Sequence, residues 1–243
     1  MGGVKPTIPD GVAFEILSIP GPHGQQVRIH HFKTKAQSGP SAAVIHFHGG
    51  GFITLSADIN TQRLAGIVLE TGVQVFSVDY RLAPEHPYPA AFNDGCATLA
   101  WIHKNASILN VDLARIAILC SPMLDDRTTG DVPGDFKLWD EEDNLTGWTA
   151  YLGKPPEGDN VPATAAPARV RDVAGLPPLY LDTSQFDLFV RENLRYVQRF
   201  VDAGIEVESH VHPGLPHGFD ALLPTHSVTM AYEKNRQRIL KKL

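Results

Sequence analysis

A run of glycines near residue 48 could stabilise negative charge on an oxygen atom. The sequence His48-Gly49-Gly50-Gly51-Phe52 comes directly after the apolar residues 42–47. Glycines at a strand end let backbone N–H groups approach a ligand that a Cβ atom would exclude, and they reach positive φ without strain. Donors held where negative charge develops supply about 3 to 4 kcal/mol of transition-state stabilisation in enzymes. The run therefore predicts an oxyanion hole for acyl transfer, with a flexible glycine-rich loop as the alternative.

Later in the chain, one carboxylate and one histidine could supply an acid and a base. Asp187 lies just beyond one apolar strand pattern, and His217 follows another. Taken alone, Asp187 reads as a carboxylate near a helix start, where the helix dipole favours negative charge, and His217 as an ordinary loop histidine. Their order after the glycine run matches a Ser-acid-His triad whose serine lies in a G-x-S-x-G elbow between the glycines and the acid. No G-x-S-x-G occurs in this sequence, so the expected nucleophile is missing.

Alternating strand and helix patterns should position these residues. Residues 42–47 and 73–80 read as strands buried on both faces, and residues 60–70 between them have helical spacing, which predicts a βαβ unit and a largely parallel sheet. Ligands of such sheets bind at the carboxyl ends of the strands, where the polar residues cluster here. Further strands are expected at 14–19, 26–32, 115–119, 179–182 and 207–211, and further helices at 90–103, 189–203 and 227–240.

Composition indicates one globular α/β domain over residues 1–243, with the polar, acidic residues 125–160 as a cap or lid insertion. The chain has 43% hydrophobic residues, a net charge of −6 and two cysteines. This charge gives no footprint for nucleic acid, and two cysteines fit a reducing compartment. No stretch approaches the ~20 apolar residues of a membrane span, and residues 1–10 lack the apolar core of a signal peptide. A cytoplasmic location is the expectation.

Metal binding is the alternative for two histidine pairs. His46 and His48, and likewise His210 and His212, are two residues apart on strands and so share a face. Such pairs ligate zinc when a third ligand converges on them. In a chain with 11 histidines the pairs arise easily, so ordinary strand histidines are the preferred interpretation. No metal and no cofactor are expected.

The chain resembles the hormone-sensitive lipase-like carboxylesterases and lipases of the α/β-hydrolase fold over nearly its whole length. Six segments carry the resemblance in the right order: His48-Gly49-Gly50-Gly51-Phe52, Asp79-Tyr80-Arg81-Leu82-Ala83-Pro84-Glu85, Ser121-Pro122-Met123-Leu124-Asp125, Leu176-Pro177-Pro178, Asp187 before Arg191-Glu192-Asn193, and Pro213-Gly214-Leu215-Pro216-His217-Gly218-Phe219. The resemblance implies a mostly parallel sheet with helices on both faces and a small helical cap insertion.

The family's roles apply at matching positions. Gly50 and Gly51 would offer oxyanion N–H groups, and Gly49 would let the loop approach the substrate. Asp187 would be the triad acid that orients His217, the general base.

The departure from the family lies around residues 115–122. The strand that begins at Arg115 should end in the serine-bearing turn, followed by a helix and another strand before the Ser-Pro-Met-Leu-Asp segment, but here Cys120 runs straight into Ser121. A parallel crossover needs a dozen or more residues, so two family strands are predicted to be fused, leaving one strand and one helix fewer. Ser121, Cys120 and Ser184 are poor substitutes for the serine, since a nucleophile must approach the base to about 3 Å beside its oxyanion donors.

Three functions follow as alternatives. The first is a carboxylic ester hydrolase by descent, inactive as this chain. The second is a non-catalytic protein that binds a small acyl ester or other apolar molecule, like the plant gibberellin receptors, which resemble the same family. The third is a shortened splice or gene-model product without independent function. A homo-oligomer is left open.

Overall fold

The computed structural model describes residues 7–120, 122–130, 137–156 and 158–243, with the backbone alone for 114–120. The chain divides into two compact units, one of residues 1–121 and 232–243 and one of residues 122–231. Each unit is described by itself. The strands of the described residues form one sheet of five and one of two. A single domain over residues 1–243 stays a prediction.

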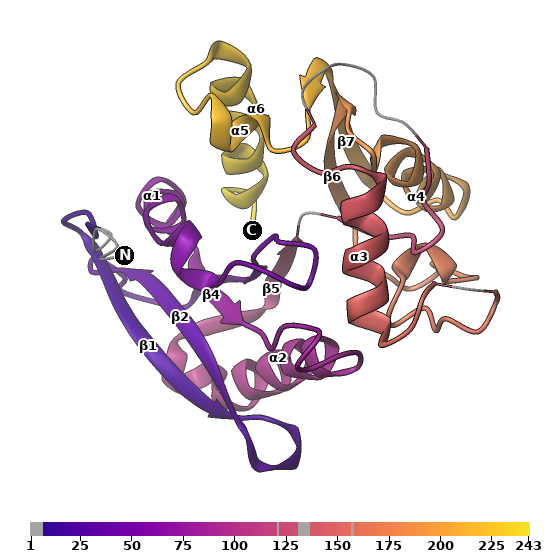
Figure 1. Ribbon diagram of the computed structural model, residues 1–243. Coiled ribbons are helices and arrows are strands. Elements are labelled where there is room, and N and C mark those ends of the chain that lie inside the picture. Colours follow the sequence, from indigo (N-terminus) through magenta and orange to yellow (C-terminus); the bar gives the residue numbers. More distant parts are fainter. Residues whose placement is uncertain (1–6, 121, 131–136, 157) are drawn as a thin grey trace. The chain divides into compact units, whose positions relative to one another are not determined.

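The first unit is built on a mixed five-stranded sheet in the order β1-β2-β4-β3-β5 (Figure 1). Its strands are β1 (Val12–Pro20), β2 (Gln26–Thr34), β3 (Ser41–Phe47), β4 (Gln74–Asp79) and β5 (Val111–Cys120). The β1–β2 hairpin and the β2–β4 pair are antiparallel, whereas β3 pairs parallel with both β4 and β5. The predicted hairpin and βαβ unit are therefore confirmed.

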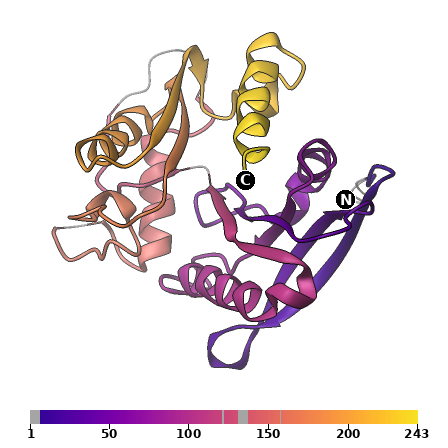
Figure 2. The same cartoon turned by 180° about the vertical axis from the view of Figure 1, so that it is seen from behind.

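Helices cover both faces of this sheet. Helix α1 (Thr61–Thr71) lies on one face and α2 (Ala90–Leu109) on the other, with the strands between them in both views (Figures 1 and 2). Because side chains alternate along a strand, Val44 and its register partner Val75 pack with the α1 core, which also includes Leu240 near the end of α6 (Ser227–Leu240). Ile45 and its partner Phe76 are fully buried on the opposite face.

Helix α2 runs six residues beyond its predicted end at 103, and β5 starts before its predicted start at 115. The extension buries Ala106, which continues the apolar face marked by Ile102. Asn110 ends the helix in the left-handed conformation, with φ of 59° and its N–H bonded to Ala106 O. Asparagine tolerates this conformation, so the signal was present but weaker than a glycine.

The second unit contains β6 (Leu179–Phe186) and β7 (Val207–Pro216), which pair in parallel. Helix α4 (Val190–Asp202) connects them and packs against both strands. Inside the acidic 125–160 region lies α3 (Glu141–Leu152), which begins with a capping box between Asp140 and Asp143. A short helix, α5 (Phe219–Leu222), follows β7 and was not predicted, because four residues are too few to show a period. No described helix is long and apolar enough to cross a bilayer.

Candidate functional site

The glycine run leaves the end of β3 as a tight loop that only glycine fits at one position. Gly50 has φ of 111° and Gly51 of 58°. A Cβ atom on Gly50 would lie 2.2 Å from Thr54 O, whereas one on Gly49 would meet nothing within 4 Å. Gly50 O accepts hydrogen bonds from Ile53 N and Thr54 N at 3.0 and 3.1 Å. The loop is thus folded on itself at Gly50 and open at Gly49, which argues against a flexible glycine linker.

His48 and Tyr80 fasten this loop to the ends of β3 and β4. Their rings stack with centroids 4.1 Å apart and 8° between planes, and the Tyr80 hydroxyl donates to His48 O at 2.7 Å. His48 Nδ1 donates to Gly49 O at 2.7 Å. Burial lowers the pKa of His48, although that hydrogen bond and the charge of Asp79 oppose it. A neutral His48 with its proton on Nδ1 therefore fixes the carbonyl group of Gly49 by a hydrogen bond.

The segment after β4 carries a buried ion pair. Asp94, 1% exposed on α2, accepts two bonds from Arg81 Nε, one from Arg81 Nη2 at 2.8 Å and one from the Arg81 backbone N–H at 3.0 Å. Two residues on, Ala83 N donates to Phe52 O at 3.0 Å. The ion pair therefore fixes the backbone that supports the far end of the glycine loop.

In the second unit the predicted acid and base lie together. His217 Nδ1 is 2.7 Å from Asp187 Oδ2, and Asp187 Oδ1 accepts the Phe189 N–H at 2.9 Å. The Asp187 side chain is 8% exposed and that of His217 is 33% exposed. A carboxylate that is held in this way fixes the imidazole orientation and leaves Nε2 as the nitrogen that can take a proton.

Electrostatics favour a proton on this imidazole. Burial works against the charged form, but the hydrogen bond to Asp187 and the charges of Asp187 and Asp220 outweigh it, so the pKa of His217 lies above its ordinary value. A base with a raised pKa is suited to accept a proton from a hydroxyl group during attack on a carbonyl carbon.

An apolar cluster follows Asp187 in the chain and contacts His217 through Phe189. Leu188 and Phe189 are buried, with Met123, Trp139 and Phe186 packed against them. The Phe189 ring meets the His217 ring edge to face at 5.5 Å. Gly218 follows the base in the left-handed conformation, and a Cβ atom there would come within 2.5 Å of Leu138 Cδ2. Residues of the 125–160 region therefore reach the turn that carries the base.

The other candidate residues are the possible substitutes for the serine and the histidines considered for zinc. Ser184 is buried within β6, 4% exposed, and is fixed in the ladder beside His212. Ser121 lies outside the described residues, as does the side chain of Cys120. The histidines considered for zinc have protein partners instead: His46 contacts Ser77, His48 contacts Gly49, His210 contacts Glu208, and His212 contacts Asp182.

Sequence reasoning assigned no role to Tyr80 or Glu192, although both stand in segments that carried the resemblance. Tyr80 follows the β4 strand, and an aromatic residue there reads as core. Glu192 lies in the first turn of α4, where an acidic residue is explained by the helix dipole. In the folded chain both side chains form hydrogen bonds with backbone groups that are distant in sequence.

Comparison with known proteins gives the family. A model of the alpha/beta hydrolase fold family matches residues 44–119 and 115–221. The chain belongs to the α/β-hydrolase fold family. Esterase LipI of Mycobacterium tuberculosis is 30% identical over 84% of this chain and 73% of its own length. Carboxylesterase NlhH of the same species is 29% identical, and the chain spans 66% of its length.

Solved structures of other α/β hydrolases agree with the fold. A bacterial heroin esterase superposes with a TM-score of 0.90 at 32% identity, over 96% of this chain and 84% of that one. Esterase LipW from Mycobacterium marinum gives 0.86 at 30% identity, over 96% of this chain and 82% of that one. The expected fold class and the resemblance to hormone-sensitive lipase-like carboxylesterases are thereby confirmed.

Proposed function

We propose that this α/β hydrolase is a carboxylic ester hydrolase by descent that, as this chain, has little or no esterase activity. The observation that carries the proposal is an Asp187–His217 pair at 2.7 Å in a sequence without a G-x-S-x-G elbow. His217 is the general base and Asp187 its orienting acid. Gly50 and Gly51 offer the oxyanion N–H groups, and Gly49 leaves room for the substrate. Removing the serine of a triad lowers turnover on the order of a millionfold.

The way the family model matches supports a missing segment near residues 115–119. Its two matched ranges share residues 115–119, so the same five residues serve at the end of one range and the start of the other. In the structure these residues belong to β5, which pairs with β3 from Ala43↔Ile116 to Phe47↔Cys120. This supports a fusion of two family strands, with the nucleophile turn, one helix and one strand lost between them.

A serine-reactive probe tests the absence of the nucleophile. Purified chain is treated with a fluorophosphonate and, separately, with a short-chain aryl ester. We expect no labelling and hydrolysis at the level of buffer. Efficient hydrolysis that His217→Ala abolishes would refute the proposal. His226→Ala, at an exposed histidine, is the matched control.

A graft tests whether the rest of the site is intact. A G-x-S-x-G turn, with the helix and strand that the family resemblance leads us to expect after it, is inserted between Leu119 and Cys120. We expect the chimera to label with the probe and hydrolyse the ester, and His217→Ala and Asp187→Asn to lower that activity. A folded chimera without activity would show that the retained groups are no longer competent.

Non-catalytic binding is the second candidate, and it would use the same exposed Gly49, whose Cβ position meets nothing within 4 Å. The ligand would be a small acyl ester or another apolar molecule. Saturable binding of an uncleaved ester to the wild-type chain, weakened by Gly49→Ala, would support this role. No saturation by any ester would leave the shortened-product interpretation. The cytoplasmic location, the absence of nucleic-acid partners and the oligomeric state remain predictions.

A further inference from the structure

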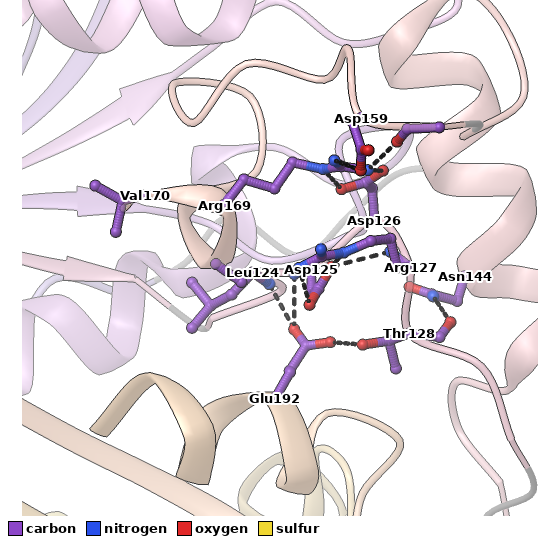
Figure 3. A network of polar contacts seen from close by, with 12 residues as sticks. Leu124, Asp125, Asp126, Arg127, Thr128, Asn144, Asp159, Arg169, Val170 and Glu192 are labelled. Carbon is purple, nitrogen blue, oxygen red and sulfur yellow. Dashed lines mark hydrogen bonds and ion pairs between the residues drawn. The ribbon is translucent and has the colours of Figure 1, made fainter. Parts of the chain in front are cut away.

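Glu192 of helix α4 has a buried carboxyl group that faces the start of the cap region. It lies in the first turn of α4, five residues after Asp187, and is 3% exposed. Its Oε1 accepts the backbone N–H groups of Leu124 and Asp125 at 2.6 and 3.2 Å, and its Oε2 is hydrogen-bonded to Thr128 Oγ1 (Figure 3). One side chain therefore holds three residues that lie more than 60 positions away.

The residues that it holds, 124–128, are called here the pre-cap segment because α3 follows them. Thr128 O accepts from Asn144 Nδ2 of α3 at 3.0 Å, and Leu124 O accepts from Ala168 N at 3.0 Å. One end of the pre-cap segment is therefore hydrogen-bonded to α3 and the other to Ala168, which lies beyond the 125–160 region. Thr128 thus contacts Glu192 through its hydroxyl and Asn144 of α3 through its carbonyl.

The charged side chains of the pre-cap segment form ion pairs that do not include Glu192. Asp125 is bonded to Arg127 at 2.7 Å, and Asp126 to Arg169 at 2.6 Å (Figure 3). Of these groups, Asp125 acts on Glu192 through its negative charge. Arg127 keeps Asp125 ionised: although burial raises the pKa of Asp125, the hydrogen bonds and charge of Arg127 lower it further. The negative charge of Asp125 thus acts on Glu192, while Arg127 and Arg169 are paired with Asp125 and Asp126.

We propose that Glu192 is a positioning residue whose carboxyl fastens the pre-cap segment to α4, and that one proton on this carboxyl tightens or loosens the attachment. The proposal goes beyond ester hydrolysis, because it requires neither a nucleophile nor a substrate. It follows from the contacts: every polar atom of the side chain is engaged, and none of the partners is a cation.

The two protonation states differ in their hydrogen bonds and in their charge. With the proton on Oε2, the neutral carboxyl donates to Thr128 Oγ1 and still accepts two N–H groups at Oε1. Without it, the Thr128 hydroxyl must donate instead, and a buried negative charge faces Asp125. Burial, opposed by the hydrogen bonds and assisted by the charge of Asp125, raises the pKa of Glu192 to about 7. The change of state therefore falls within the physiological pH range.

Hydrogen exchange measured on the full chain tests this attachment. Protection of the amides of residues 122–130 is followed by mass spectrometry from about pH 5 to pH 8.5, after correction for the intrinsic rate. When the segment opens, the Glu192 carboxyl should regain its ordinary pKa of 4.5. Protection of these amides should then fall on the order of 100-fold from the low to the high end of this pH range, because each unit of pKa difference changes the opening equilibrium tenfold.

Variants separate the proton from the side chain. Glu192→Gln copies the protonated form, so we expect high protection at every pH. Thr128→Val removes one partner and keeps the charge, so it should lower protection and retain the pH dependence. Glu206→Gln, at an exposed position of the same unit, should behave as wild type. If Glu192→Gln kept the wild-type pH dependence, or if Glu192→Ala folded and protected the segment as well as wild type, the proposal would be wrong.

Discussion

Asp187 divides its two oxygens between two partners: Oδ2 lies 2.7 Å from His217 Nδ1, and Oδ1 accepts the Phe189 N–H at 2.9 Å. The acid is thereby tied both to the base and to the start of α4. Orientation of the imidazole depends on the same turn that begins the helix. The pair is therefore a preformed element of the fold that does not need a substrate to assemble.

Asp187→Asn should lower the pKa of His217. In the wild type, the hydrogen bond and charge of Asp187 raise this pKa against burial, and only burial and the weaker effect of Asp220 would remain. A raised histidine pKa contributes stability below the unfolded-state value, and the contribution disappears as pH rises through the folded-state value. Asp187→Asn should therefore lose the stability that the raised pKa of His217 contributes at acidic pH. NMR titration of the imidazole measures the shift, and Asp220→Asn, which removes a charge but no hydrogen bond, should give a smaller decrease.

Gly50→Ala should destabilise the first unit by about 2 kcal/mol or more, because positive φ and a contact with Thr54 O both oppose a Cβ atom. Gly49→Ala should change the free energy of unfolding by less than about 1 kcal/mol, because its Cβ atom meets nothing. Urea denaturation compares the two. Equal losses would contradict the loop geometry described above.

Acid should destabilise the protein through His46. Burial, assisted by the charges of Arg236 and Arg63, lowers the pKa of this histidine to about 3. The unfolded chain therefore binds a proton first, so the stability contributed by neutral His46 is complete above its ordinary pKa of 6.5 and is lost as pH falls towards 3. His46→Gln should flatten this part of the stability curve. Denaturation midpoints measured across the acidic range check it, with exposed His86→Gln as the control.

Asp94→Ala should destabilise the protein by about 3 kcal/mol, because it leaves the Arg81 guanidinium and backbone N–H without their acceptor. The Arg81 side chain is 28% exposed, and this partial contact with water keeps the effect at the lower end for a broken buried pair. Glu70→Ala, at an exposed position near the end of α1, should change stability by less than about 0.5 kcal/mol. Thermal unfolding of both variants provides the comparison.

Periodicity and turn residues were sufficient to predict most of the framework. The alternation around Gly21 predicted the β1–β2 hairpin, and the apolar runs either side of α1 predicted a parallel pair. Boundaries that depend on tertiary contacts were missed. The last turns of α2 rest on the burial of Ala106, and β7 runs on to Pro216 because it pairs with Phe186 across an irregularity that no local pattern shows.

The candidate site was predictable where a residue type is tied to a chemical role. Asp187 and His217 were expected to meet, and they do so at 2.7 Å. Supporting contacts were not predictable, because Tyr80 and Glu192 act on backbone groups that lie far away in the sequence. Side-chain type identifies what a group can do, whereas a bond to distant backbone depends on the folded path of the chain.

Trp139 packs against the Leu188–Phe189 cluster beside the acid and base. An indole in that position senses the polarity and order of its surroundings through its emission spectrum. The part of the emission that Trp139→Phe removes, with Trp101 and Trp148 as the remaining indoles, therefore reports on ligand binding or protonation near Asp187 and His217 without any need for turnover.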